Sequence, residues 1–156
     1  MAYLKKMSGA IAIAILVFAN GTLAAADDSF SKECVWDRCK FRENKVMGTY
    51  CNNDNKKEFD YDWTQIDLGR CVGNNGGALV ASEDGKFHES CDDCKLTNKH
   101  KDGTQYLVCN CWGTDDKKHE SKLDLAEVLY NRNGKLGCFD HQGSKFDRPP
   151  PYWKDE

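Results

Sequence analysis

The chain has 156 residues, of which 40% are hydrophobic and 30% are charged, and its formal net charge at pH 7 is −3. This acidic balance disfavours the phosphate backbone of a nucleic acid as the main partner. The length is enough for one domain once an N-terminal leader is set aside.

The first 26 residues have the features of a secretory signal peptide. Lys5 and Lys6 form a basic start, residues 10–18 are apolar but too few to span a bilayer, and residues 24–26 are small, as at a cleavage site. The rest of the chain has 20 basic and 25 acidic residues, a net charge of −5. We therefore expect a secreted, extracellular protein without a membrane partner. A lone membrane anchor is the competing interpretation.

A unit of about 50 residues occurs twice, over residues 30–80 and 87–138, at an offset of 57 positions. The same offset relates Phe30 to Phe87 and Cys34 to Cys91. Two repeats are too few for an open solenoid, so we expect them to share one core. The identical pairs within the motif are Asp67 and Asp124, Leu68 and Leu125, Asn74 and Asn131, Gly77 and Gly134, and Leu79 and Leu136.

Short strands and turns are predicted in both repeats. Residues 47–51 and 107–111 alternate in the period-two pattern of a half-buried strand, and residues 101–104 carry a hairpin-turn signal. The Asn-rich and Gly-rich segments at 74–77 and 131–134 are predicted turns, because Asn and Gly tolerate left-handed backbone geometry. Nothing indicates a long helix. The sequence therefore predicts short strands joined by turns in each half.

Asp67 and Asp124 each end a predicted strand, and we interpret them as structural acceptors for backbone N–H groups. The C-terminal tail (residues 140–156) has no counterpart in the first repeat. Its proline run, residues 149–151, imposes an extended path that cannot join a helix or a central strand. We expect the tail to be mobile or loosely draped on the surface, although Tyr152 and Trp153 offer a means of docking.

The ordered motif, written twice, resembles the cyanovirin-N homology (CVNH) lectin family. It consists of Phe-x-x-x-Cys, a hairpin that ends in Cys, Ile/Leu-Asp-Leu, an Asn and Gly turn, and Leu. The resemblance covers residues 30 to about 139, which gives a domain over residues 27–139. The residues that carry it are Phe30, Cys34, Cys51, Ile66, Asp67, Leu68, Asn74, Gly77 and Leu79, then Phe87, Cys91, Cys111, Leu123, Asp124, Leu125, Asn131, Asn133, Gly134 and Leu136.

The resemblance implies an all-β, pseudo-twofold, disulfide-stapled fold in which strands of the two repeats intermix. It also implies a sugar-binding protein without a catalytic site or cofactor, which typically recognises α1-2-linked mannose on high-mannose glycans. Such a family suits a secreted protein, often one from a fungus.

One sugar pocket per half is implied as well. Asn, Asp, Glu and Lys side chains on rigid turns suit the hydroxyl groups of a sugar. The first pocket would use residues before Cys34, residues 52–55, and the turn of the second repeat. Its candidates are Lys32, Glu33, Asn52, Asn53, Asp54, Asn131, Arg132 and Asn133.

The second pocket departs from the family pattern. Gly73 and Gly76 stand where an acidic side chain often occurs, and Trp112 replaces a polar or basic residue. Glycine supplies no side-chain acceptor, so we expect a weak or altered site in which the indole could stack on a sugar ring. Its candidates are Asn74, Asn75, Lys86, Glu89, Ser90, Trp112 and Thr114, with Gly73, Gly76, His88 and Gly113 beside them.

All nine cysteines follow the signal peptide, and in a secreted chain they indicate a disulfide framework with one thiol left over. The resemblance assigns Cys34 to Cys51 and Cys91 to Cys111. Hairpin register brings Cys94 near Cys109, with cross-pairing left open. A zinc site of these four sulfurs is the alternative, which export disfavours. Of the remaining three we prefer a bond between Cys71 and Cys138, leaving Cys39 free or available for an intermolecular bridge.

The sequence supports two functional hypotheses. The first is a secreted lectin for mannose-rich glycans, without cofactor or metal. The alternative is a disulfide-rich interaction protein that keeps the scaffold but has lost sugar binding, and acts through its tail or odd thiol. An enzyme is disfavoured because no motif singles out a pair of carboxylates and the cysteines are better explained as bridges. The sequence leaves the oligomeric state open.

Overall fold

The computed structural model of the chain describes residues 29–55, 60–97 and 105–153. The predicted signal peptide and the predicted turn at residues 101–104 lie outside these ranges. Within them, no helix has the length and apolar character needed to cross a membrane.

The described chain is built almost entirely of short strands, as predicted. Its helical elements are α1 (Ser29–Glu33) and the single-turn 3-10 helices η1 (Trp36–Arg38), η2 (Leu68–Arg70), η3 (Phe87–Glu89), η4 (Leu125–Glu127) and η5 (Pro151–Trp153). The strands are β1 (Lys40–Arg42), β2 (Val46–Asn52), β3 (Tyr61–Asp67), β4 (Val72–Asn75), β5 (Ala78–Ala81), β6 (Cys91–Thr97), β7 (Tyr106–Trp112), β8 (Lys118–Asp124), β9 (Tyr130–Arg132), β10 (Lys135–Cys138), β11 (His141–Gln142) and β12 (Ser144–Phe146).

The strands form antiparallel sheets that repeat between the halves. The first repeat contributes the meander β1-β2-β3, and the second contributes β6-β7-β8 in the same order. A hairpin follows each meander: β4-β5 in the first repeat and β9-β10 in the second, with β11 added beside β10. Asp67 and Asp124 end the third strand of each meander. Each accepts a hydrogen bond from the backbone N–H two residues later, at 2.8 Å, which confirms their structural role.

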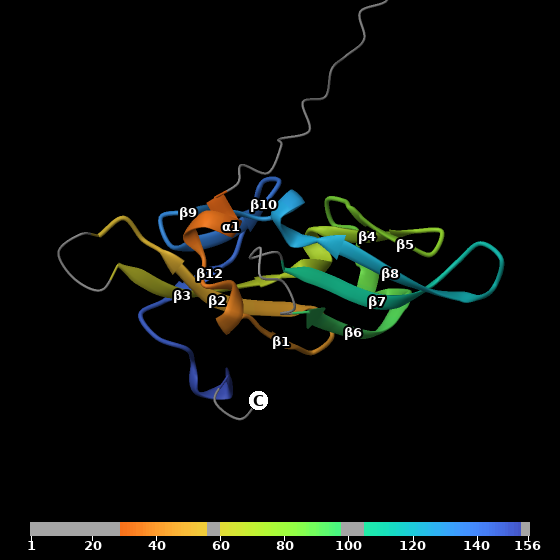
Figure 1. Ribbon diagram of the computed structural model, residues 1–156, viewed down its shortest axis with the longest axis horizontal. Coiled ribbons are helices and arrows are strands. Elements are labelled where there is room, and N and C mark those ends of the chain that lie inside the picture. The colour runs from red at the N-terminus through yellow and green to blue at the C-terminus, as the bar shows by residue number, and fades with distance from the viewer. Residues whose placement is uncertain (1–28, 56–59, 98–104, 154–156) are drawn as a thin grey trace, which may run out of the picture.

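The two repeats exchange their hairpins. In Figure 1, β4 and β5 of the first repeat lie beside β7 and β8 of the second, whereas β9 and β10 lie with α1 and β2 at the other end. Equivalent hydrogen bonds join each exchanged hairpin to its host sheet. Leu79 N–H donates to Ser121 Oγ at 2.8 Å, and Leu136 N–H donates to Thr64 Oγ1 at 3.0 Å. Because both partners differ by 57 positions, these bonds show the pseudo-twofold symmetry directly.

One hydrophobic core serves both repeats. The equivalent aromatic residues Phe30 and Phe87 are buried in it, as are the equivalent leucines Leu79 and Leu136. Most disulfide sulfurs belong to the same cluster. Neither repeat could bury its apolar face alone, because the hairpin that covers that face comes from the other repeat.

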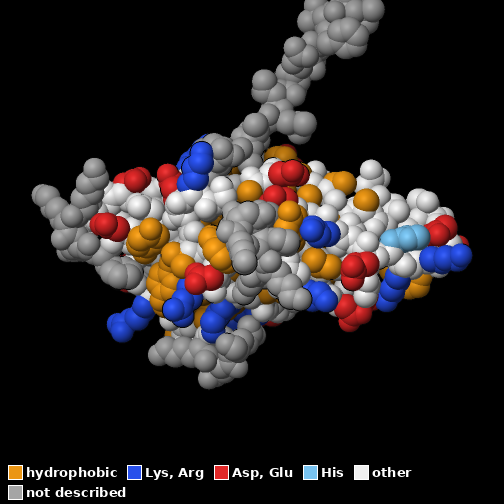
Figure 2. Space-filling view, in the orientation of Figure 1, with side chains coloured by type: hydrophobic (Ala, Val, Ile, Leu, Met, Phe, Trp, Pro, Cys, Tyr) orange, Lys and Arg blue, Asp and Glu red, His pale blue; other side chains and the backbone are white. Residues whose placement is uncertain are grey.

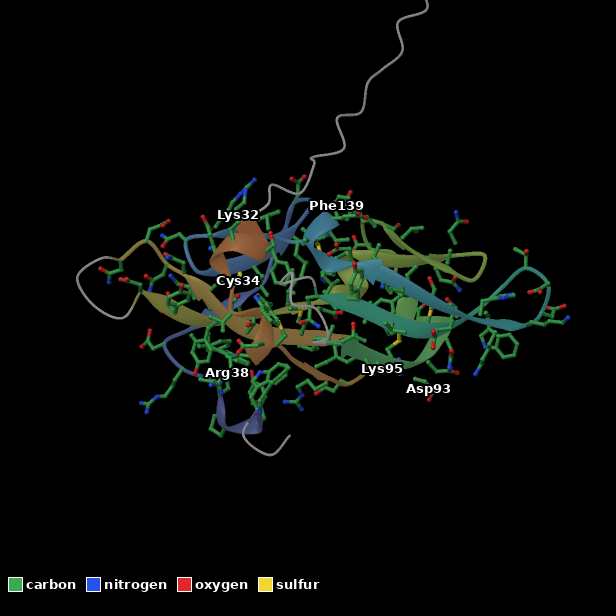
Figure 3. All side chains as sticks on the ribbon, viewed as in Figure 1. Lys32, Cys34, Arg38, Asp93, Lys95 and Phe139 are labelled. Atoms are coloured by element: carbon green, nitrogen blue, oxygen red, sulfur yellow. A yellow bond between two sulfur atoms is a disulfide. The ribbon has the colours of Figure 1, made fainter. Side chains whose placement is uncertain are left out.

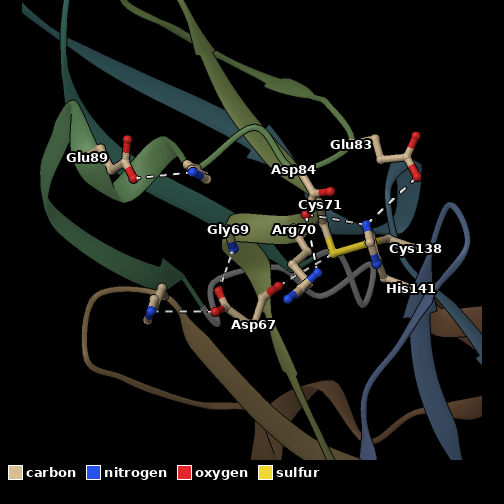
Figure 4. Close-up of polar contacts among 11 residues, drawn as sticks. Asp67, Gly69, Arg70, Cys71, Glu83, Asp84, Glu89, Cys138 and His141 are labelled. Carbon is tan, nitrogen blue, oxygen red and sulfur yellow. Dashed lines mark hydrogen bonds and ion pairs between the residues drawn. A yellow bond between two sulfur atoms is a disulfide. The ribbon is translucent and has the colours of Figure 1, made fainter.

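Four disulfides form, and they include every predicted pair. Cys34 bonds Cys51, Cys91 bonds Cys111, Cys94 bonds Cys109, and Cys71 bonds Cys138. Cys39 is left as the free thiol. Figure 4 shows that the Cys71–Cys138 bond joins the two repeats beside His141, whose Nε2 lies 3.4 Å from Asp84.

The expectation that the C-terminal tail is loose is wrong for the part described. Residues 144–146 form β12, which pairs with β3 at the edge of the first sheet, and Pro151 begins η5. Proline is tolerated there because the first N–H of a helical turn has no internal partner. Trp153 is only 1% exposed and packs against Trp63. Burial of this indole fixes a segment whose proline run alone indicated mobility.

Candidate functional site

A polar pocket of about 570 Å³ lies at the first-half end of the molecule. Its walls are the loop after β2, the start of β3, the β9-β10 turn and β12. The residues that line it are Asn53, Asp54, Asn55, Tyr61, Asp62, Asn133, Lys145 and Asp147. Asn53, Asp54 and Asn133 are predicted site residues, and residues 52–55 were expected to contribute. Sequence reasoning missed Tyr61, Asp62, Lys145 and Asp147.

Local hydrogen bonds fix the start of the loop after β2, over residues 52–55. Asn52 Oδ1 accepts from the Asp54 N–H at 2.8 Å, and Asn53 Oδ1 accepts from the Asn55 N–H at 2.9 Å. Such Asx turns favour the positive φ of +59° at Asp54. Asn133 and Gly134 also have positive φ values, +52° and +75°, in the β9-β10 turn. Residues 52–55 and the β9-β10 turn therefore present polar side chains from a backbone with little conformational freedom.

Asn131 connects three segments behind this pocket. Its side-chain Nδ2 donates to Glu33 Oε2 at 2.8 Å and to the Asn52 carbonyl at 2.9 Å, and its backbone N–H donates to Ser29 Oγ at 2.8 Å. The residue is only 5% exposed. The structure thus brings the predicted residues Glu33, Asn52 and Asn131 together, with Asn131 acting as a link between α1, β2 and β9. Direct contact between Asn131 and a sugar stays a prediction.

Lys32 and Arg132 lie outside the set that lines the pocket. Figure 3 shows Lys32 on α1, at the outer surface of the molecule. The Arg132 guanidinium lies 4.4 Å from the centre of the Tyr130 ring. Both side chains are exposed, so their roles as sugar contacts also stay predictions.

In the second half, Asn74 makes hydrogen bonds equivalent to those of Asn131, but with different partner residues. Asn74 Nδ2 donates to Ser90 Oγ at 3.0 Å and to the Trp112 carbonyl at 2.9 Å, and its Oδ1 accepts from the Gly77 N–H at 2.8 Å. Ser90 is the counterpart of Glu33. The predicted residues Asn74, Ser90 and Trp112 therefore meet, as their equivalents do in the first half.

The rim of this second region carries an exposed indole. Trp112 is 50% exposed, and Lys118 Nζ lies 5.1 Å from its ring centre. A Cβ added at Gly76 would lie 3.4 Å from Thr114, so the two turns approach each other closely. Asn75 is exposed at the same turn.

Lys86 lies opposite Gly73, and Glu89 follows it in η3. Lys86 pairs with Gly73 in an isolated bridge, and its Nζ lies 3.9 Å from Glu89 Oε1. These two predicted residues thus face each other as an exposed ion pair.

The pocket of the first half is acidic. Asp54, Asp62 and Asp147 contribute three carboxylates, and Lys145 contributes the ammonium group. Lys145 Nζ lies 2.9 Å from Asp62 Oδ2 and donates to the Asn133 carbonyl at 3.1 Å. On the face shown in Figure 2, by contrast, acidic and basic side chains are interspersed.

Two groups outside the pocket have shifted pKa values. Burial raises the pKa of the Cys39 thiol to about 12. A hydrogen bond from His119 lowers the pKa of Asp115, beside the second-half turn. Neither group lines the first pocket.

The pocket has the chemistry needed to bind a polyhydroxylated ligand. Amide, carboxylate, phenol and ammonium groups converge on it, and each can donate to or accept from hydroxyl groups. Among the described residues, no group of three or more His, Cys, Asp or Glu side chains could hold a metal ion.

A duplicated all-β chain with exchanged hairpins and a polar pocket in a pseudo-symmetric half defines a cyanovirin-type scaffold of the lectin class. The chain belongs to the CVNH family, because residues 30–137 match the CVNH domain. This match ends before β11, so the C-terminal tail lies beyond it. A search of curated proteins gave no match.

Several solved structures are similar to this chain. GzCVNH from Gibberella zeae has 20% identity and a TM-score of 0.62, over 72% of this chain and 98% of that one. Microvirin, solved in complex with mannobiose, has 21% identity and a TM-score of 0.58, over 71% and 98%. A MoCVNH3 variant, solved with (N-GlcNAc)4, has 17% identity and a TM-score of 0.59, over 74% and 99%. At these identities the likeness shows the fold.

Proposed function

We propose that the protein is a secreted, non-catalytic lectin that binds mannose-rich glycans through the pocket of its first half. The observation that carries this proposal is the convergence of Asn53, Asp54 and Asn133 on one pocket, from two turns that belong to different repeats. Hydrogen bonds within the first turn and the fixed backbone of both turns reduce the entropic cost of holding a ligand.

The choice of ligand rests on chemistry and on the family. Neutral sugars offer many hydroxyl groups, which suit a pocket lined by amides and carboxylates. Two of the similar structures were solved with mannobiose and with an N-acetylglucosamine oligomer, which supports carbohydrate as the ligand class. Mannose as the sugar follows from the family resemblance. Secretion is supported by the four disulfides, which suit an oxidising compartment.

A glycan array of the oxidised protein, residues 27–156, tests the proposal. We expect selective binding to glycans with terminal α-mannose over unrelated sugars. If a folded sample binds no glycan, the lectin function is refuted, and the scaffold would serve another partner.

A paired substitution locates the site. Asn133→Gly removes the amide but accepts the positive φ, and Asp54→Asn keeps the shape and backbone tolerance while removing the charge. We expect the double variant to lose at least about tenfold in affinity, since a hydrogen bond to a charged group contributes roughly 1.5–3 kcal/mol. Asp140→Asn is the control, because Asp140 is exposed, lies outside both candidate sets and undergoes the same change as Asp54. Equal losses in both variants would place the site elsewhere.

A further inference from the structure

The C-terminal tail forms one wall of the first-half pocket. Its strand β12 pairs with β3 in a register that sets Ser144 opposite Gln65, Lys145 opposite Thr64, and Phe146 opposite Trp63. Directly opposed residues of an antiparallel pair share a face of the sheet. Lys145 therefore shares a face with Thr64, whose hydroxyl accepts from Leu136 of the exchanged hairpin. This register carries Lys145 towards the β9-β10 turn.

Lys145 connects the two walls that Asn133 and Asp62 provide. Its ammonium group lies 2.9 Å from Asp62 Oδ2 and donates to the Asn133 carbonyl at 3.1 Å. Asp62 is only 15% exposed in its side chain, and Lys145 is 35% exposed. A lysine outside the part matched to the family thus fixes the turn that carries a predicted sugar contact.

The tail is held firmly enough to perform this role. Trp153 Nε1 donates to Gln65 Oε1 at 2.7 Å, and its ring centre lies 5.4 Å from that of Trp63. The Arg42 guanidinium lies 5.5 Å from the Trp153 ring and 4.8 Å from the Tyr152 ring. These contacts anchor Tyr152 and Trp153 on the sheet that β12 extends.

The charges on the pocket select among sugars. Asp147 of the tail, with Asp54 and Asp62, places three carboxylates around one ammonium group. A neutral sugar has no charge for these carboxylates to repel. A sugar that carries a phosphate or carboxylate is repelled, and each carboxylate about 6 Å away costs roughly threefold in affinity in a water-like dielectric.

We propose that the C-terminal tail is part of the sugar site: Lys145 is a positioning residue for Asn133 and Asp62, and Asp147 helps to restrict the site to uncharged sugars. This inference rests on the proposed function. It assigns to the tail a role in holding the pocket and in excluding charged sugars.

Titration of the oxidised protein with α1-2-mannobiose and with mannose 6-phosphate tests the inference, with NMR shifts as the readout. We expect Lys145→Met to weaken mannobiose binding about tenfold and Lys145→Arg to restore most of it. Asp147→Asn should leave mannobiose binding nearly unchanged while reducing the preference over mannose 6-phosphate about threefold. Arg148→Met is the matched control, because Arg148 is an exposed cation of the same tail that does not line the pocket.

The outcomes separate the two proposals. If the wild-type protein binds neither sugar, the proposed function fails and this inference fails with it. If the wild-type protein binds mannobiose and Lys145→Met binds it equally well, the proposed function stands and the role of Lys145 is refuted. A preference that Asp147→Asn does not change refutes the role of Asp147. Amide spectra of each variant show whether the fold is intact, and Lys145→Arg provides the test if Lys145→Met does not fold.

Discussion

Breaking the disulfide between the repeats will destabilise the protein more than breaking the innermost hairpin disulfide. Cys71 and Cys138 are separated by 67 residues, and Cys94 and Cys109 by 15. In the chain-entropy description, closing these loops stabilises the fold by about 4 and about 3 kcal/mol, respectively. Both values are upper limits, because the Cys91–Cys111 bond shortens the loop from Cys71 to Cys138 and also encloses the 15-residue loop. The shortening is proportionally much larger for the 15-residue loop, so it lowers the second value more. The expected difference is therefore more than about 1 kcal/mol.

Double alanine variants test this comparison. Cys71→Ala with Cys138→Ala removes two sulfurs from the shared core, and Cys94→Ala with Cys109→Ala is the matched control. Alanine avoids burying a new hydroxyl group, and each variant removes two sulfur atoms. Urea unfolding, followed by the fluorescence of the buried tryptophans, measures the free energy of unfolding, and mass mapping verifies the remaining bonds. Equal losses, or a larger loss for the control, would refute the loop-length reasoning.

Four further predictions concern single residues. Cys39, with its pKa raised to about 12, should react with iodoacetamide at pH 8 roughly a thousandfold more slowly in the folded protein than in urea, because the thiolate is the reactive form; comparable rates would contradict its burial. Trp153→Ala should cost about 3 kcal/mol in urea unfolding, as expected for a buried indole, and no change would mean that the tail is loose. His119→Ala should raise the pKa of Asp115 in an NMR titration. Because the folded-state pKa is lowered, the stabilisation is present above the unfolded-state pKa and is lost as the pH falls through the folded-state value. Asn74→Ala should cost about 2–3 kcal/mol, since three hydrogen bonds are lost, and a neutral result would refute the linking role.

The duplication made most of the fold predictable. A fixed offset of 57 positions relates residues as far apart in each unit as Phe30 and Leu79. Two copies are too few for an open solenoid, so their short apolar strands must be buried against each other in one core. The exchange of hairpins itself came from the family resemblance, since no local pattern states which sheet a hairpin will cover.

The C-terminal tail was not predictable by the same means. Residues 144–146 are too few to show a period, and the proline run is typical of a loose segment. The missing information is tertiary: Trp63 faces the outer side of its sheet and leaves an aromatic surface that Trp153 covers. Two signals were present in the sequence: Tyr152 and Trp153 offered a means of docking, and a glycine stands at position 48. Gly48 lies beneath both rings, where an added Cβ would approach Trp63 within 2.5 Å and Trp153 within 3.1 Å.

The sequence predicted the two turns of the candidate site, but not the residues that β3 and β12 contribute to it. Asn53, Asp54 and Asn133 follow from the position of each turn in the repeat. Asp62 and Lys145 do not, because Asp62 stands where the second repeat has His119, and Lys145 has no counterpart at all. Residues that repeat were thus a guide to the scaffold, and residues that do not repeat make up much of the pocket.

The contrast between Asn74 and Asn131 explains how the halves could diverge. Each asparagine uses its Nδ2 group to join an exchanged hairpin to two residues of the other repeat, one just before and one just after a disulfide-closed segment. Both asparagines are therefore needed for the fold, whether or not their half binds sugar. The residues at the rim around them do not make these structural hydrogen bonds and can therefore differ between the halves. Gly76 stands opposite Asn133 in the alignment of the repeats, and Trp112 takes the place of Asn52. A chain with one polar rim and one altered rim would bind a single glycan arm at a time, so high avidity would require several copies of the protein rather than two sites on one.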